Sequence, residues 1–301
     1  MKKRIVAILA FAVFLTAVRF AARQAVGAAQ ENVKHINVAG RDVALWTPIG
    51  AAPAHGYPLV LFSHGFTGCN TQSIFLMEAF AKAGYFALAP NHKDAHCGSA
   101  RHSGSFGRPE EPLGNPQKWT DATYRDRFDD IEAVLDAALA ERSFQGVAVD
   151  PGRVGISGHS LGGYTALGLA GAWPSWRDQR IKAVLALSPY TNPYVANGGL
   201  AHLNVPVMYQ GGTLDLGITP EVRRLHGAYD FTSRPKYYVE FDGAAHLAWT
   251  GLNRTYHESI AAYSVAFFDH YLKAQTDPDP LAPLFSQGAH PGVSYLKLSK
   301  E

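Results

Sequence analysis

RVGISGHSLGGYTALGLA, residues 153–170, is the stretch of sequence from which the fold can be predicted. A β-branched run leads into a glycine-rich turn, and an apolar segment of helical period follows. Residues 158–162 fit G-x-S-x-G between a predicted strand and a predicted helix, the context in which this pattern presents a nucleophilic serine. The alternative, a glycine-rich turn with an incidental serine, is disfavoured by the flanking elements and by Gly163. We therefore expect Ser160 to be the nucleophile.

Short apolar runs alternate with helical segments on both sides of this stretch. The runs are residues 59–62, 85–90, 181–188, 205–210 and 236–242, and the helical segments are 73–82, 121–142, 161–170, 220–228 and 254–273. Residues 33–48 alternate around Gly40 like a β-hairpin. Continuous apolar strands separated by helices indicate a mostly parallel sheet covered on both faces, which is the α/β class.

The first 29 residues have the pattern of a signal peptide. A basic start is followed by fourteen uncharged residues, 5–18, and by small residues around 27–29. Fourteen residues are too few to span a bilayer, which takes about 20, although an uncleaved anchor remains the alternative. The remaining residues, 30–301, are expected to form a single catalytic domain that is secreted or periplasmic.

Charge and composition narrow the class of protein. The chain is 47% hydrophobic and 17% charged, which is typical of a globular protein. Five of the 27 basic residues and none of the 25 acidic ones lie in residues 1–29, so the net charge without them is −3. A mildly acidic surface gives no footprint for nucleic acid or an anionic membrane. We expect a monomer.

The two cysteines, Cys69 and Cys97, each follow an apolar strand. Placed in loops at one edge of a parallel sheet in an exported protein, they are in reach of a disulfide bond. Two unpaired buried thiols are the alternative.

A nucleophilic serine needs a histidine base and an acid that orients it, and in this architecture they follow in the order serine, acid, histidine. Asp215 follows the strand at 205–210, and His246 follows the strand at 236–242. Asp230 is the next acid candidate, disfavoured because it lies beyond a helix. His226 and His257 fall within helical segments. The predicted catalytic residues are therefore Ser160, Asp215 and His246.

Acyl transfer also needs N–H donors for the developing oxyanion. One is expected from Leu161, the residue after the nucleophile, and the other from Phe66 in the loop at 62–68. Phe66 and Trp249, three residues past His246, are also predicted to contact substrate.

Residues 91–120 form an unusually long irregular segment, expected to be one wall of the site. Residues 188–204 are too few for a large cap, so we expect an open cleft. His92, His96, Cys97 and His102 have no standard zinc spacing, and neither a metal nor a cofactor is expected.

These motifs resemble the α/β-hydrolase superfamily, within its dienelactone-hydrolase-like and platelet-activating-factor-acetylhydrolase-like branch, and are similar to bacterial cutinases that degrade polyesters. The resemblance rests on LFSHGFTG, GHSLGGYTAL, RFDDIEAVLDAAL, GTLD and AAH, and covers most of residues 57–272. Leu161 stands where bacterial cutinases usually carry Met. Tyr190 would serve as the aromatic residue that follows their next strand, in contact with substrate.

The resemblance implies a serine carboxylic-ester hydrolase that acts without cofactor on small or polymeric esters. The expected substrates are short-acyl esters and polyesters such as PET. A lipid esterase of the platelet-activating-factor-acetylhydrolase type and a peptidase or amidase are the alternatives among enzymes. A binding protein without turnover is disfavoured by the complete set of catalytic residues. Dienelactone hydrolases themselves use cysteine, so Ser160 argues against that activity.

Overall fold

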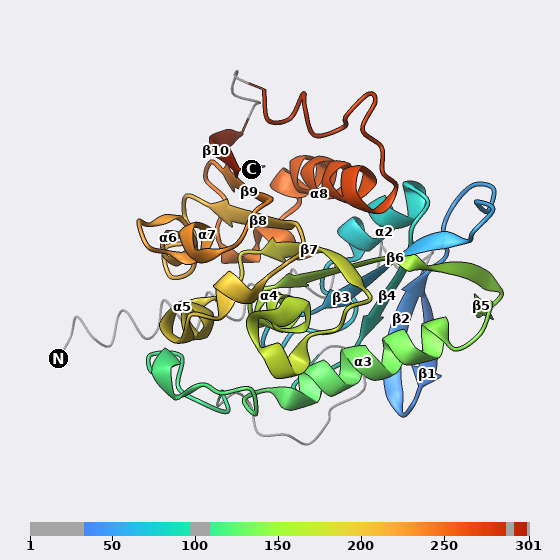
Figure 1. Ribbon diagram of the computed structural model, residues 1–301, viewed down its shortest axis with the longest axis horizontal. Helices are drawn as coiled ribbons and strands as arrows, with labels where there is room; N and C mark the ends of the chain where they lie inside the picture. Colours follow the sequence, from blue (N-terminus) through green and yellow to red (C-terminus); the bar gives the residue numbers. More distant parts are fainter. Residues whose placement is uncertain (1–32, 97–108, 287–291, 300–301) are drawn as a thin grey trace.

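The computed structural model describes residues 33–96, 109–286 and 292–299. Its centre is one mixed sheet with strand order β1-β2-β4-β3-β6-β7-β8-β9-β10, and β5 pairs with β6 beside this path (Figure 1). From β4 through β9 neighbouring strands are parallel, whereas β1, β2 and β10 pair antiparallel with their neighbours. The strands are β1 Lys34–Val38, β2 Arg41–Trp46, β3 Tyr57–Ser63, β4 Phe86–Pro90, β5 Ser143–Phe144, β6 Val147–His159, β7 Ile181–Leu187, β8 Val207–Gly212, β9 Lys236–Phe241 and β10 Val293–Ser299.

The inner strands are apolar on both sides because both faces of the sheet are buried. In β3, Leu59 and Leu61 belong to one apolar cluster, and Val60 and Phe62 belong to the other. Successive side chains of a strand point to opposite faces, so each strand contributes to two cores. The α/β class predicted from the sequence is confirmed.

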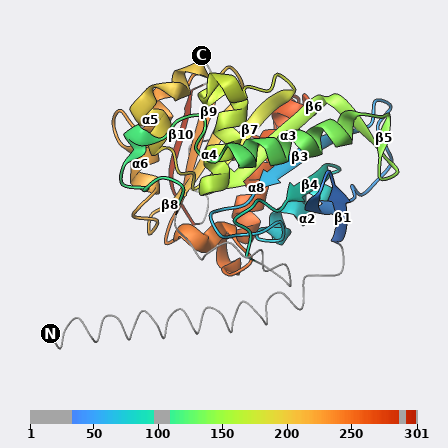
Figure 2. The ribbon, with the colours of Figure 1, turned by 90° about the horizontal axis from the view of Figure 1, so that it is seen from below.

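Helices cover both faces. Helices α2 and α8 pack on one side, and α3 to α7 contribute to the cluster on the other side (Figure 1). Seen from below, α3 and α4 lie in front of the sheet (Figure 2). The helices are α2 Ile74–Lys82, α3 Arg125–Leu139, α4 Leu161–Leu167, α5 Asn192–Asn197, α6 Thr219–Arg223, α7 Ala228–Phe231 and α8 His257–Leu272.

Several element boundaries differ from the sequence prediction. The helix expected from residue 121 begins at Arg125, because the chain turns before it and Tyr124 has a left-handed φ of 59°. The helix expected over 220–228 is split into α6 and α7. The predicted helix to residue 170 is α only to Leu167 and continues as a π-helical turn to Ala172. β10, which the pattern does not predict, adds an edge strand to β9.

Some predictions concern residues outside the described ranges. The signal peptide at 1–29, Cys97 and His102 all lie there. Cys69 is buried, and its sulfur lies 3.3 Å from the Thr71 hydroxyl. The Cys69–Cys97 bridge therefore stays a prediction. Within the described residues, none of the helices is both long and apolar enough to cross a membrane.

Candidate active site

Ser160 occupies a sharp turn between β6 and α4. Its backbone has φ 55° and ψ −116°, a conformation that is uncommon for a residue with a side chain. Close approach of the turn to its surroundings explains the glycines. A Cβ at Gly162 would lie 1.9 Å from the Ser63 carbonyl oxygen, and a Cβ at Gly158 would lie 2.1 Å from that of Gly162. The turn therefore packs directly on the end of β3 and places the serine at the carboxyl ends of the parallel strands.

The structure brings the three predicted catalytic side chains together. His246 Nε2 lies 2.9 Å from Ser160 Oγ, and His246 Nδ1 lies 3.2 Å from Asp215 Oδ1. Asp215 follows β8 and its side chain is 3% exposed, whereas the His246 side chain, after β9, is 35% exposed. This geometry allows the imidazole to take a proton from the serine hydroxyl while a buried carboxylate orients it. The rival acid, Asp230, pairs instead with Lys297.

A second serine, Ser188, joins the acid and the histidine. It directly follows β7, its hydroxyl donates to Asp215 Oδ2, and its Oγ lies 2.9 Å from His246 Nδ1. The Nδ1–H of His246 is therefore shared between a carboxylate oxygen and a hydroxyl oxygen. The sequence analysis missed this residue, although its position immediately after a parallel strand was an available signal.

The two backbone donors predicted for an oxyanion are the N–H groups of Phe66 and Leu161. Among the described residues, neither the Phe66 N–H nor the Leu161 N–H has a hydrogen-bond partner. A Cβ on Gly65 would lie 3.4 Å from the Cβ of Ser160, so the loop that carries Phe66 passes directly beside the nucleophile. Both donors thus lie next to Ser160, where their hydrogen bonds can stabilise a negatively charged oxygen.

His159 ties three parts of the site together. Its Nε2–H donates to the His246 carbonyl oxygen at 2.8 Å, and its Nδ1 accepts from Gln72 Nε2 at 3.1 Å. The other end of the Gln72 amide, Oε1, accepts from the Gly65 N–H at 3.0 Å. Burial, assisted by the neighbouring His246, lowers the pKa of His159 to about 3, so the ring stays neutral at physiological pH.

A pocket of about 470 Å³ opens over Ser160. Phe66 and Tyr190 line it as predicted, and the Tyr190 hydroxyl donates to the Leu113 carbonyl oxygen at 2.6 Å. The remaining walls are largely apolar. They come from Leu113, Tyr124, Leu161, Leu214, Leu216, Ile218 and Ala245, with Asp215, Gly217 and His246 completing the lining.

Trp249 does not line this pocket, and its predicted contact with substrate is wrong. Its ring is fully buried in the core on the α2 and α8 side, and its Nε1–H donates to Gln210 Oε1 at 3.0 Å. The short 3-10 turn that begins at His246 directs the tryptophan inward, behind His159.

The histidines considered as metal ligands have other roles where the structure describes them. His92 is buried, with Nδ1 3.0 Å from Asp130 Oδ2 and Nε2 2.8 Å from Ser63 Oγ. His96 Nδ1 bonds the Asp94 carbonyl oxygen. Within residues 33–96, 109–286 and 292–299, no group of three or more His, Cys, Asp or Glu side chains is arranged to hold a metal ion.

Comparison with known proteins identifies the family. Residues 121–281, more than half of the chain, match the family model for PET hydrolase-like proteins. The chain belongs to the PET hydrolase-like family. The α/β-hydrolase fold and the resemblance to bacterial cutinases are confirmed. The matched region of this PET hydrolase-like chain contains Ser160, Asp215 and His246, whereas the Phe66 loop precedes it.

Curated relatives of this PET hydrolase-like chain are cutinases of Thermobifida. Cutinase est2 of Thermobifida alba is 26% identical over 225 residues, which is 73% of this chain and 61% of that protein. Cutinase 2 of Thermobifida cellulosilytica is 32% identical over 145 residues, 48% of each chain. Cutinase cut1 of Thermobifida fusca is 32% identical over 145 residues, 48% of this chain and 40% of that protein. The match thus spans less than two thirds of these relatives.

Proposed function

We propose that this chain is an exported serine hydrolase of carboxylic esters, with Ser160 as nucleophile, His246 as general base and acid, and Asp215 as the residue that orients the histidine. The observation that carries the proposal is the continuous contact from Ser160 Oγ through His246 to Asp215, beside two backbone N–H groups that have no partner in the part of the chain that the structure describes. The names of the relatives, all cutinases, support ester chemistry.

The reaction follows from these positions. Ser160 Oγ attacks the ester carbonyl carbon while its proton passes to His246 Nε2, and the Phe66 and Leu161 N–H groups bind the oxyanion. The bond to the alcohol oxygen breaks, and the alcohol leaves with the proton from His246. A water molecule then gives its proton to His246 and attacks the acyl carbon. The acid leaves, and Ser160 regains its proton. Asp215 stays ionised throughout.

Apolar side chains around the pocket mouth support accessible, apolar esters as substrates. Leu216 is 75% exposed and Leu214 is 60% exposed, on the same loop as Asp215. Leu113, from the segment after β4, is also exposed on the other wall. Exposed leucines grouped at a pocket mark a surface that binds apolar material. We propose short-acyl esters and polyester chains, such as PET, as the substrate class.

The test measures hydrolysis of p-nitrophenyl acetate, butyrate and palmitate, and release of soluble products from PET and polycaprolactone particles. Wild-type protein is compared with Ser160→Ala and with Ser157→Ala, a matched control whose buried hydroxyl bonds the Leu61 carbonyl oxygen in the neighbouring strand β3. We expect turnover of short esters and polymer by the wild type and by Ser157→Ala. Ser160→Ala should lose at least about 1,000-fold.

Two results would redirect the proposal. Equal turnover by Ser160→Ala and the wild type would reject the assigned nucleophile. Cleavage of p-nitroanilides without cleavage of any ester would favour an amidase. A preference for phospholipids with a short acyl chain, measured in the same series, would favour a lipid esterase.

Export and the disulfide bond belong to the same proposal. We propose cleavage of the signal near residue 29 and a bond between Cys69 and Cys97. The mass of the mature protein, measured before and after alkylation under non-reducing conditions, tests both. A thiol count of two in the mature protein would reject the bond.

A further inference from the structure

In the loop after β3, the Phe66 N–H lies between two backbone donors that are paired with side chains. The Gly65 N–H donates to Gln72 Oε1 at 3.0 Å, and the Thr67 N–H donates to Asp94 Oδ2 at 2.9 Å. Between them, the Phe66 N–H has no acceptor among the described residues. Backbone N–H groups beside a site are normally paired, so the pattern on either side of Phe66 isolates a single donor at the pocket.

The orientation of that donor depends on the carbonyl oxygen of Gly65. The Gly65 carbonyl and the Phe66 N–H belong to one trans peptide plane and point in opposite directions. His64 Nδ1–H donates to the Gly65 oxygen at 2.8 Å and the Gly68 N–H donates to it at 2.9 Å, while the Arg127 guanidinium approaches it at 3.4 Å. Fixing this oxygen on the protein side directs the Phe66 N–H to the opposite side, where the pocket lies.

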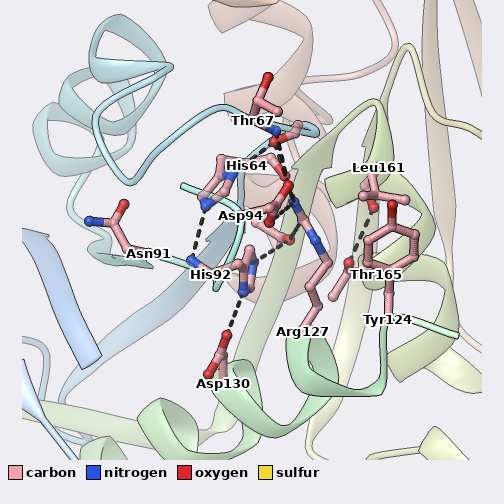
Figure 3. Close-up of polar contacts among 12 residues, drawn as sticks. His64, Thr67, Asn91, His92, Asp94, Tyr124, Arg127, Asp130, Leu161 and Thr165 are labelled. Atoms are coloured by element: carbon pink, nitrogen blue, oxygen red, sulfur yellow. Dashed lines mark hydrogen bonds and ion pairs between the residues drawn. The ribbon is translucent and has the colours of Figure 1, made fainter. Parts of the chain in front are cut away.

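Arg127 is the group that joins these contacts. It comes from α3, its side chain is 0% exposed, and its Nη1 donates to the His64 carbonyl oxygen at 2.7 Å. Its Nη2 lies 2.8 Å from both carboxylate oxygens of Asp94 (Figure 3). The same carboxylate accepts from the Thr67 N–H. One ion pair therefore holds the loop backbone both before and after Phe66.

The surroundings favour the charged form of the ion pair and the neutral form of the two neighbouring histidines. Burial opposes ionisation of Asp94, but the Arg127 guanidinium and the Thr67 N–H outweigh it and lower the pKa of Asp94 to about 2. Burial lowers the pKa of both His64 and His92 well below the usual range, assisted by the charge of Arg127. Arg127 is thus the cation that faces the loop, and its charge polarises the Gly65–Phe66 peptide.

We propose that Arg127, held by Asp94, is a positioning residue that orients the Gly65–Phe66 peptide so that the Phe66 N–H donates to the oxyanion. Neither side chain touches substrate, and both act through the loop. The inference rests on the proposed ester hydrolysis and names a determinant of its rate. Loss of the ion pair should weaken binding of the oxyanion and leave binding of the neutral ester unchanged.

The test compares Arg127→Met, Arg127→Lys and Asp94→Asn with the wild type on p-nitrophenyl butyrate. Butylboronic acid, which forms a tetrahedral anion on a nucleophilic serine, reports the oxyanion site directly. We expect kcat to fall about 100-fold in Arg127→Met and about 10-fold in Arg127→Lys and Asp94→Asn, since loss of one oxyanion donor costs about 100- to 1,000-fold. KM should stay within about twofold, and the inhibition constant of butylboronic acid should rise in parallel with the loss of kcat.

Lys236→Met is the matched control. Lys236 is also a buried cation that donates to loop carbonyls, with Nζ 2.7 Å from the oxygens of Tyr229 and Thr232. It lies in β9, however, and these hydrogen bonds do not involve the Phe66 loop. Its loss should lower Tm and leave kcat unchanged. If Arg127→Met does not fold, Arg127→Lys and Asp94→Asn decide the question.

Two results would overturn the inference. The first is wild-type kcat and boronate affinity in folded Arg127→Lys and Asp94→Asn. The second is an equal loss of kcat in Lys236→Met at the same loss of Tm, which would assign the effect to general loosening of the fold. Absence of ester turnover by the wild-type protein would instead overturn the proposed function. The failure of the inference and the failure of the proposed function are therefore distinguishable.

Discussion

The two sides of Ser160 are built in opposite ways. On the side proposed for acid–base chemistry, Ser188, Asp215 and His246 lie on loops after β7, β8 and β9, and the histidine is about one-third exposed. On the oxyanion side, the loop at residues 64–67 is held from below by the buried ion pair of Arg127 and Asp94. One side is partly open to solvent, and the backbone of the other is held by hydrogen bonds both before and after Phe66.

The difference follows from what each side has to do. A general base must exchange protons with substrate and water, so part of its ring has to be accessible. Oxyanion donors act by being fixed before charge develops, so the loop that carries the Phe66 N–H is held by side chains from several elements. Substitutions on the acid–base side should therefore lower kcat, and those on the oxyanion side should lower both kcat and Tm.

The largest effect is expected for His246→Ala. Turnover of p-nitrophenyl butyrate should fall at least about 10,000-fold, because the base for Ser160 is lost. Tm should change by less than about 2 °C, since the ring is partly exposed and the backbone carbonyl that binds His159 remains. Steady-state kinetics and thermal denaturation check both values. A large loss of Tm would contradict the division into two sides.

The second largest effect is expected in the pH dependence of the free energy of unfolding, through three buried histidines. His64, His92 and His159 have lowered pKa values in the folded protein, chiefly through burial. The unfolded chain therefore binds more protons once the pH falls below about 6.5. The stabilisation they contribute is complete above that pH and is lost as pH falls toward the folded pKa values. Each histidine contributes a loss of up to about 1.4 kcal/mol per pH unit.

Urea denaturation between pH 8 and pH 5 measures this loss. Asp130, which faces His92 beside Arg41, has a pKa raised by burial, so its protonation acts in the opposite direction. His159 is remote from that carboxylate. His159→Gln should therefore remove the contribution of one histidine to the slope of the free energy of unfolding against pH. A free energy of unfolding that is constant from pH 8 to pH 5 would contradict the neutral state assigned to the buried rings.

The smallest effect is expected for Ser188→Ala. It removes one of the two acceptors of the His246 Nδ1–H and one donor to Asp215, while the direct contact of 3.2 Å between them remains. We expect kcat to fall about tenfold, as for loss of one hydrogen bond to a charged group. KM should be unchanged. A loss as large as that of His246→Ala would show that the serine, and not the carboxylate, orients the histidine.

The acid–base side could largely be predicted from the sequence. Each of its predicted residues directly follows a buried apolar strand, and the carboxyl ends of parallel strands meet at one edge. Trp249 shows where that reasoning ends, because nearness to His246 along the chain does not determine which way a short turn directs a ring. β10 was missed because it is an edge strand with few buried side chains.

The supports of the oxyanion side could not be predicted in the same way. Arg127 lies 63 residues from the carbonyl that it binds, within the charged run RDRFDD, which is typical of a solvated helix surface. Only the packing of α3 beneath β3 buries it. Gln72 and Asp94 likewise follow from tertiary contacts that no local pattern records.

Covalent labelling tests whether Ser160 is a nucleophile that His246 activates. Wild-type protein, Ser160→Ala and His246→Ala are incubated with a fluorophosphonate, and the intact mass and the modified peptide are determined by mass spectrometry. We expect one adduct per chain, on Ser160, absent in Ser160→Ala and formed far more slowly in His246→Ala. An adduct on another residue, or labelling of His246→Ala at the wild-type rate, would contradict it.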